Sequence, residues 1–279
     1  IVTEAATAPG QHIRAAGEDV AAGTTILEAG TRLTAAEIGL AVIAGRATVR
    51  VTRRPRVTIL ATGDELIPPG EPLGPGQIHD SNALTLAALA TSAGAEVLAR
   101  THVRDTEQDT RDKLETALET SDVVIVSGGV SVGPHDHVKP ALEALGVTES
   151  FWRVALRPGK PTWFGTRSGT VVFGLPGNPV SAMVTFLLFA RPALAKLQGA
   201  DPTQTRIRAS LTEPIPRNPG RDEAVRVRLA DTETGRQATP TGPQGSHQLT
   251  SMRGADGLAL VRQGDGEVRP GEPVTVELI

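Results

Sequence analysis

The chain has 279 residues, of which 39% are hydrophobic and 21% charged, and this near-average globular composition excludes a disordered or fibrous polymer. Lys and Arg number 28 against 31 Asp and Glu, and a net charge of −3 lacks the basic excess expected of a nucleic-acid binder. The absence of cysteine excludes disulfides, thiolate zinc sites and cysteine nucleophiles, so any metal must be held by oxygen or imidazole ligands.

Residues 1–54 are interpreted as a partial N-terminal segment that acts as a linker or in dimerisation. Turn signals at Ala16-Gly17 and Ala29-Gly30 suggest two short strands. The Thr34 to Glu37 spacing is that of a capping box, which predicts a helix from Thr34 to about residue 44. Two strands and one helix bury little core, so we expect this segment to pack on something else.

Residues 55–200 alternate apolar β-rich runs with helical patterns. The expected elements are strands at 57–60, 96–103 and 122–126 and helices at 83–93, 106–120 and 138–145. This alternation predicts right-handed βαβ units and hence an α/β fold, a three-layer domain with a mainly parallel sheet. Ligands of such sheets bind beyond the carboxyl ends of the strands.

The longest uncharged run, residues 168–190, is long enough to span a membrane, but Gly174, Pro176, Gly177 and Pro179 interrupt it. We therefore predict a buried strand, a turn and a buried helix, and no membrane span. The N-terminus has no basic and apolar leader pattern and begins at Ile1 rather than Met. We expect a cytoplasmic protein and a chain that is a fragment or has been processed.

Residues 201–279 have a different character. Short alternating strands are expected at 206–211, 224–229, 258–261 and 274–278, separated by Gly/Pro turns. This pattern predicts a small all-β C-terminal domain, either a barrel or a sandwich, with its boundary near residues 198–202.

A glycine-rich loop, SGGVSVGPHD at residues 127–136, directly follows the predicted strand at 122–126. Gly128 and Gly129 let backbone N–H groups converge on an anion. Ser131 adds a hydroxyl, and Asp136 stands where a carboxylate could hold a divalent cation. The alternative is a simple strand-to-helix turn in which the Asp caps the helix.

Two further polar turns are expected at the same rim. One is Thr62-Gly63-Asp64-Glu65, and the other is Asp80-Ser81-Asn82 at a helix start. Asp80 could bind Mg²⁺, which prefers carboxylate oxygens, and Ser81 or Asn82 could bind phosphate. The alternative is that this run only caps the helix, because Asp, Ser and Asn are the usual N-cap residues.

Two proline-containing turns complete the candidate rim. Arg157-Pro158-Gly159-Lys160-Pro161 holds two cations in a stiff turn that suits an oxyanion, although a solvated surface turn has the same composition. The turn at Asn178 and Pro179 opens an apolar helix, and its alternative role is helix initiation with proline in the first turn.

These loops in combination resemble the molybdopterin molybdenumtransferase family, the molybdenum-insertion enzymes of molybdenum cofactor biosynthesis, which are related to the E domain of gephyrin. The likeness rests on SGGVSVGxxD at 127–136, RPGKP at 157–161 and GLPGNPVSA at 174–182. It extends over nearly all of residues 11–279 and includes the runs at 17–19, 29–33 and 62–66, in the family's order.

The resemblance implies insertion of molybdate into adenylylated molybdopterin, with Mg²⁺-dependent cleavage of the phosphoanhydride and release of AMP, by a homodimer. It implies metal-binding roles for Asp80 and Asp136. Catalytic roles are implied for Asp136, Lys160 and Ser131. The substrate-binding residues implied by motif match are Thr62, Gly63, Asp64, Glu65, Ser81, Asn82, Gly128, Gly129, Arg157, Pro161, Asn178, Pro179, Arg226 and Ser251.

Two departures from the family pattern affect these expectations. Arg157 stands where lysine is common, which keeps the charge but changes the shape of the donor. The family's N-terminal Asp-Gly-Tyr-type motif and extra domain do not precede Ile1. If that region closes the site from the partner subunit, this chain should bind ligand but turn over weakly, and restoring the region should raise AMP release.

Two other functions compete with this interpretation. The related molybdopterin adenylyltransferases share the α/β fold but typically carry Gly-Gly-Thr-Gly in the loop and would not need the β domain. A non-catalytic binding scaffold, as in gephyrin, would expose an apolar groove near the β domain. Neither a nucleic acid nor a membrane is expected as a partner.

Overall fold

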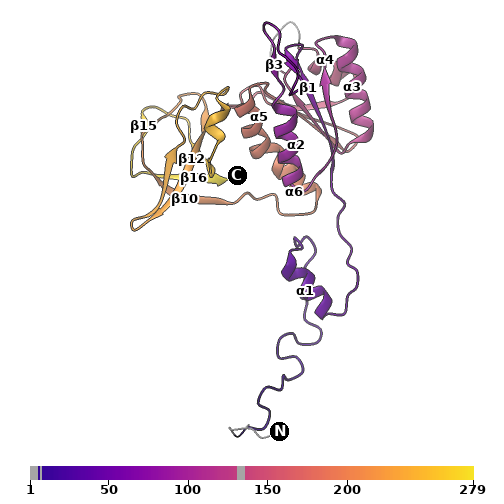
Figure 1. Ribbon diagram of the computed structural model, residues 1–279, viewed down its shortest axis with the longest axis vertical. Helices are drawn as coiled ribbons and strands as arrows, with labels where there is room; N and C mark the ends of the chain where they lie inside the picture. The colour runs from indigo at the N-terminus through magenta and orange to yellow at the C-terminus, as the bar shows by residue number, and fades with distance from the viewer. Residues whose placement is uncertain (1–5, 7, 131–135) are drawn as a thin grey trace. The chain divides into compact units, whose positions relative to one another are not determined.

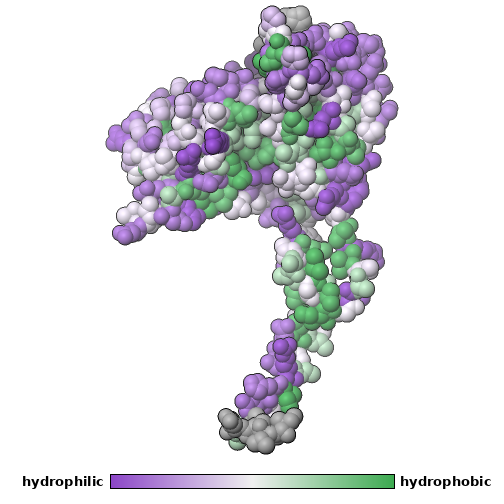
Figure 2. All heavy atoms as spheres, in the orientation of Figure 1, coloured by the Kyte–Doolittle hydropathy of each residue, from purple (hydrophilic) through white to green (hydrophobic). Residues whose placement is uncertain are grey.

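The computed structural model describes residue 6 and residues 8–130 and 136–279, and the chain divides into two compact units, 1–52 and 53–279 (Figure 1). The first unit contains helix α1 (Ala35–Ile43), which starts in the expected capping box: Glu37 accepts from the Thr34 N–H at 2.8 Å. Apolar side chains of α1, including Ile38 and Val42, lie exposed on this unit (Figure 2).

The two short strands expected in the N-terminal segment are wrong for the part of the first unit that the structure describes. Its backbone N–H groups close local turns instead of pairing across a ladder. Glu18 donates to the Ala15 carbonyl at 3.1 Å and Thr31 to the Glu28 carbonyl at 3.2 Å. Turn signals therefore dominate this segment, and strand pairing does not form.

The main sheet of the second unit has six strands in the order β4-β1-β5-β9-β8-β6. Strands β4, β1, β5 and β9 are parallel, whereas β8 and β6 run antiparallel to their neighbours. The bounds are β4 (Glu96–Val103), β1 (Arg56–Thr62), β5 (Val123–Ser127), β9 (Thr170–Leu175), β8 (Trp163–Arg167) and β6 (Thr148–Trp152). The expectation of a mainly parallel sheet is confirmed.

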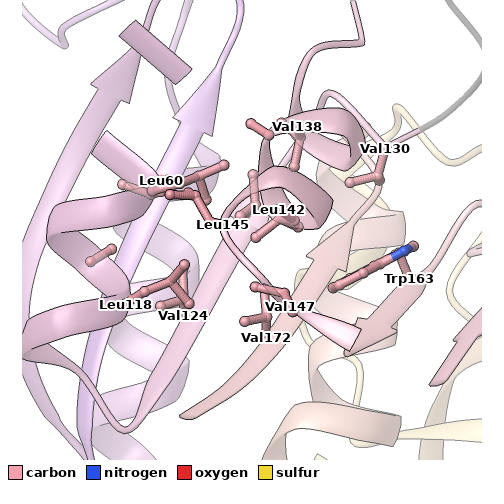
Figure 3. Packing of buried hydrophobic residues seen from close by; sticks show 14 of the residues in the cluster. Leu60, Leu118, Val124, Val130, Val138, Leu142, Leu145, Val147, Trp163 and Val172 are labelled. Carbon is pink, nitrogen blue, oxygen red and sulfur yellow. The ribbon is translucent and has the colours of Figure 1, made fainter. Parts of the chain in front are cut away.

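Helices cover both faces of this sheet because its central strands are apolar on both sides. Val123 and Ile125 of β5 pack under α2 (Asn82–Ser92), α5 (Pro179–Thr185), η1 (Phe186–Ala190) and α6 (Arg191–Leu197). Val124 and Val126 pack on the opposite face under α3 (Glu107–Thr120) and α4 (Val138–Ala144), with Leu60 and Leu142 in the same cluster (Figure 3). The predicted three-layer architecture is confirmed.

The uncharged run folds as expected into β9, a turn and a helical segment. Pro179–Leu197 is 19 residues long and apolar enough to cross a membrane by length and composition, but half of it is buried inside the protein. Ala182, Phe186 and Leu194 of this segment belong to the cluster packed on the sheet. The segment therefore serves as a core helix of the α/β layer.

The C-terminal strands close into a barrel. Strand β13 pairs with both β12 and β10, so the order β13-β10-β16-β14-β12 returns to its start. These strands are β10 (Arg206–Leu211), β12 (Asp222–Thr232), β13 (Gly235–Pro240), β14 (Gly257–Val261) and β16 (Pro273–Leu278). Strand β7 (Leu156–Arg157) adds to β12 in parallel and so carries the Arg157 turn onto the barrel.

Short elements complete the second unit: β2 (Leu66–Ile67) pairs with β3 (Ile78–His79), β11 (Ile215–Pro216) pairs with β15 (Glu267–Val268), and η2 (Leu249–Met252) is a single turn. An apolar cluster joins the helical layer to the barrel through Val180 and Val184 of α5 and Leu258 of β14. The division at residues 1–54, 55–200 and 201–279 stays a prediction.

Candidate anion-binding site

The carboxyl ends of three adjacent parallel strands place several candidate turns at one rim. In the register of the sheet, Ala61 of β1 lies opposite Ser127 of β5, and Ser127 lies opposite Leu175 of β9. The segments that follow these strands therefore leave the sheet at the same edge, where open α/β sheets bind ligands.

Gly128 and Gly129 occupy backbone conformations that other residues rarely adopt. Gly128 has φ +93° and its N–H donates to the Leu175 carbonyl at 3.0 Å. A Cβ on Gly128 would lie 2.5 Å from Thr62 Oγ1, and one on Gly129 would lie 2.6 Å from Val138 Cγ2. The glycines are needed because the turns pack this closely.

Asn82 ties three of the predicted turns together. Its buried amide Nδ2 donates to Ser127 Oγ at 2.8 Å and to the Gly177 carbonyl at 2.6 Å. Both amide hydrogens are thus used within the protein, while Asn82 Oδ1 is buried without a hydrogen-bond partner. The structure therefore shows a tether at Asn82, and its predicted contact with substrate stays a prediction.

The carboxylate of Asp80 caps helix α2, as the alternative interpretation proposed. Its Oδ1 accepts from the Ala83 N–H at 3.0 Å, whereas the Ser81 side chain makes no capping bond. Asp136 is half-buried at the end of the glycine-rich loop. Within residues 6, 8–130 and 136–279, no group of three or more His, Asp or Glu side chains gathers as a metal cage.

The donor chemistry at this rim nevertheless fits Mg²⁺. That ion is commonly held by one or two carboxylates, waters and substrate phosphates rather than by a closed protein cage. Asp80 and Asp136 are two carboxylates of this kind, and capping uses one carboxylate oxygen of Asp80. Their role as a metal pair stays a prediction.

The turn after β1 is clasped to the turn after β4. Asp64 Oδ1 accepts from the Asp105 N–H at 3.1 Å, and Asp105 Oδ2 accepts from the Asp64 N–H at 3.2 Å. The carbonyl of Gly63 accepts from His102 Nε2 at 2.7 Å. The Glu65 carboxylate lies against Gly63, 2.4 Å from where a Cβ would stand. These contacts hold the turn in place and leave the predicted binding roles untested.

The barrel contributes a buried cation. Arg226 of β12 is only 1% exposed, and its Nε donates to Ser251 Oγ at 3.1 Å. Burial and, to a smaller extent, the positive charge of Arg157 lower the pKa of Arg226 to about 10, and Glu223 partly opposes this shift. No carboxylate in the described part of the chain forms an ion pair with Arg226.

Arg157 lies beside this cation. Its Nη1 is 3.0 Å from Glu223 Oε1, and the strand that carries it pairs with β12. The following turn packs tightly on helix α5, since a Cβ on Gly159 would lie 2.5 Å from Thr185 Cγ2. Lys160 is exposed and Pro161 half-buried. Ser131 lies outside the described residues.

The barrel and the α/β rim meet at the Asn178 turn. Asn178 Nδ2 donates to Ser246 Oγ at 3.0 Å, and the Val180 N–H donates to the Ser246 carbonyl at 3.1 Å. The neighbouring Gly245 carbonyl accepts from Arg226 Nη2 at 3.4 Å. The turns predicted to converge are therefore connected by contacts from the glycine loop through Asn178 to the buried Arg226.

Three residues at this rim were not predicted from the sequence. Trp152 ends β6, and its indole N–H donates to the Val130 carbonyl of the glycine-rich loop at 3.0 Å. Lys139 Nζ lies 3.0 Å and Arg153 Cζ 4.3 Å from the centroid of the Trp152 ring. A strand prediction at 148–152 would have placed Trp152 at the same edge.

Comparisons with known proteins agree with this architecture. Three family models match: a probable molybdopterin binding domain over residues 58–196, the MoeA C-terminal region (domain IV) over 208–279, and the MoeA N-terminal region (domain I and II) over 1–45.

Individual relatives match along nearly the whole chain. Molybdopterin molybdenumtransferase 2 of Mycobacterium tuberculosis is 39% identical over 274 residues, covering 96% of this chain and 67% of the relative. Molybdopterin molybdenumtransferase of Haemophilus influenzae is 38% identical with the same coverage. The crystal structure of a molybdopterin biosynthesis MoeA protein from Pyrococcus horikoshii matches with TM-score 0.82 and 32% identity, covering 94% of this chain and 64% of that one.

The chain thus spans about two thirds of the length of these relatives. The match includes the α/β layer, the barrel and the N-terminal unit in the same order. The chain therefore belongs to the molybdopterin molybdenumtransferase (MoeA) family.

Proposed function

We propose that the chain inserts molybdate into adenylylated molybdopterin and releases AMP. Molybdate is a dianion and the adenylylated substrate is a polyanion, so a chain of net charge −3 must gather positive charge locally to bind them. Arg157, on the strand that pairs with β12, and Arg226 of β12 supply two such charges. Phosphoanhydride cleavage needs mainly positioning and charge neutralisation, so a protein nucleophile is not required.

The observation that carries this proposal is that Arg226 is buried and forms no ion pair with a carboxylate among the described residues. A buried guanidinium without an ion-paired carboxylate is costly, and we infer that Arg226 is kept here because an anion binds it. Ser251 holds the guanidinium from the barrel at 3.1 Å, and the Gly245 carbonyl accepts from it beside the Asn178 turn. In this proposal Arg226 and Ser251 bind molybdate, and Arg157, Lys160 and the Gly128-Gly129 turn bind the pterin phosphate.

Asp80 and Asp136 would hold the Mg²⁺ ion, which supplies neutralisation of phosphoanhydride charge when bound. The protein's own part is to orient the anhydride: the tethered turns fix the N–H groups of the rim, and Lys160 places a cation in the Arg157 turn. Arg226 is fixed by three hydrogen-bond acceptors, so it is already oriented before molybdate arrives. We also propose that the protein is a cytoplasmic homodimer, in line with the family resemblance.

The test mixes purified protein with adenylylated molybdopterin, Mg²⁺ and molybdate and follows AMP release and molybdenum incorporation. Asp136→Asn is expected to reduce both by 10²-fold or more, an order of magnitude typical for loss of a charge at a reacting phosphate. Asp265 is exposed, so Asp265→Asn is the matched control and should release AMP at the wild-type rate. No molybdate-dependent AMP release from wild-type protein would refute the proposed activity.

The two competing functions have different outcomes in the same assay. An adenylyltransferase would consume ATP and molybdopterin and release pyrophosphate, without needing molybdate. A scaffold would show neither reaction. The family match over residues 208–279 favours molybdate insertion over adenylylation, because the barrel supplies the buried cation.

A further inference from the structure

We propose that Lys139, Trp152 and Arg153 form a cationic arm of the site that binds a phosphate group of the nucleotide-bearing substrate. The identity of the ligand rests on the proposed function. The geometry of the arm is independent of it.

The arm lies at the ligand rim of the sheet. Strand β6 is antiparallel to β8, and β8 is antiparallel to β9, so β6 runs in the direction of β9. The carboxyl end of β6, at Trp152, is therefore at the same edge as the glycine-rich loop. The indole N–H of Trp152 confirms this placement by donating to the Val130 carbonyl at 3.0 Å.

Trp152 holds two positive charges close together. Lys139 Nζ is 3.0 Å and Arg153 Cζ 4.3 Å from the ring centroid, and the negative face of the ring attracts both cations. Neither Lys139 nor Arg153 forms an ion pair with another residue that the structure describes. Residues 131–135 contain no Asp or Glu that could pair with them. Two uncompensated charges beside an anion-binding loop suit a phosphate, which can neutralise both.

The backbone at Arg153 supports a functional arrangement. Arg153 has φ +70°, in the left-handed region that non-glycine residues rarely adopt, and its N–H donates to the Thr162 carbonyl at 3.0 Å. Strained backbone of this kind clusters at ligand-binding positions. Here the strained residue is Arg153, whose guanidinium lies over the Trp152 ring.

A purely structural role is the alternative, in which the cation–π contacts only brace α4 against β6. Loss of a brace lowers stability, whereas loss of a phosphate contact raises the KM for the substrate and leaves kcat unchanged. A phosphate contact also contributes to the salt dependence of binding, because screening weakens it. These readouts separate the two roles.

The experiment measures KM, kcat and calorimetric binding of adenylylated molybdopterin for wild-type protein, Lys139→Gln and Arg153→Gln. Each substitution is expected to weaken binding about tenfold, as for loss of one charge-assisted hydrogen bond, and to reduce its salt dependence. Lys139→Arg, which keeps the charge, should restore most of the affinity. Lys196→Gln and Arg208→Gln, exposed positions on α6 and β10, are the matched controls.

Binding is measured directly, so the outcome does not depend on turnover. A tenfold loss of affinity in either variant supports the arm even where wild-type protein releases no AMP, a result that would contradict the proposed function alone. Unchanged affinity in both variants overturns the arm, whether or not their melting temperatures fall. Failure of wild-type protein to bind the adenylylated molybdopterin overturns it as well.

Discussion

Single polar side chains in this protein fix where neighbouring turns lie. The Asp80-Ser81-Asn82 run illustrates this, because its residue types fit both a helix cap and a ligand site. In the structure, Asp80 caps α2, and the amide of Asn82 joins the turns after β5 and β9. These bonds arrange the rim on which a ligand would bind.

Asn82→Asp should damage this arrangement without changing the size of the side chain. The carboxylate would replace a donor that serves two acceptors, Ser127 Oγ and the Gly177 carbonyl, and repel the latter. We expect a loss of about 2 kcal/mol in the free energy of unfolding, the usual cost of unsatisfied buried groups, measured by urea denaturation. Among the residues that the structure describes, the Asn218 side chain bonds only through Oδ1, which accepts from the Gly220 N–H, so Asn218→Asp is a control that should cost under about 0.5 kcal/mol. Equal costs at the two positions would contradict the tether.

Arg226→Met should separate stability from function. The substitution removes a buried charge whose pKa is lowered to about 10 by burial, and an apolar side chain of similar length avoids that desolvation cost. The free energy of unfolding is expected to stay within about 1 kcal/mol of wild type, while molybdate-dependent AMP release falls by 10²-fold or more. A strongly destabilised variant with normal AMP release would show that Arg226 is structural.

At the scale of the elements, the turn at Gly128 and Gly129 is sterically constrained by its neighbours. Gly128→Ala and Gly146→Ala both place a side chain at positive φ, but a Cβ at Gly146 meets nothing within 4 Å whereas one at Gly128 meets Thr62. We expect a cost of about 1 kcal/mol at Gly146 and about 3 kcal/mol at Gly128, measured by thermal unfolding. Similar costs at both positions would mean that the contact with Thr62 does not constrain the turn.

The start of β5 is anchored by Asp122. Its carboxylate accepts from the Arg56 N–H and the Arg53 guanidinium, chiefly the latter, and this holds the pKa of Asp122 well below its usual range. A lowered carboxyl pKa contributes stability that is present above the unfolded pKa of about 4 and is lost as the pH falls below it. Asp122→Asn should therefore cost about 1 kcal/mol at pH 7 and progressively less toward pH 2, measured by chemical denaturation. A cost independent of pH would contradict the ionic account.

Elements with strong periodicity were predictable from the sequence, and those held by long-range pairing were not. Strand β5 and helix α3 carry their own signals, a run of four apolar residues and a Thr106 cap. Strand β13 has one apolar residue, Ala238, and exists because β12 and β10 flank it. The Asn82 and Trp152 contacts could not be predicted, because they join segments 22 to 95 residues apart.

At the scale of the whole second unit, the barrel and the α/β layer supply different parts of the proposed site. The turns of the α/β layer were predicted at a common rim because the ends of parallel strands share an edge. The burial of Arg226 required the structure, because the barrel closes through β13 and packs on α5 through the Val184 and Leu258 cluster. The net charge of −3 over the whole sequence gives no sign that Arg157 and Arg226 lie close together.

The most direct test of a shared site is the position of bound molybdenum. Crystals of the protein with Mg²⁺, adenylylated molybdopterin and molybdate would be measured by anomalous scattering at the molybdenum edge. We predict a single strong peak within contact distance of the Arg226 and Ser251 side chains, on the side of the Asn178 turn. A peak bound elsewhere on the chain, with this position empty at saturating molybdate, would contradict the account.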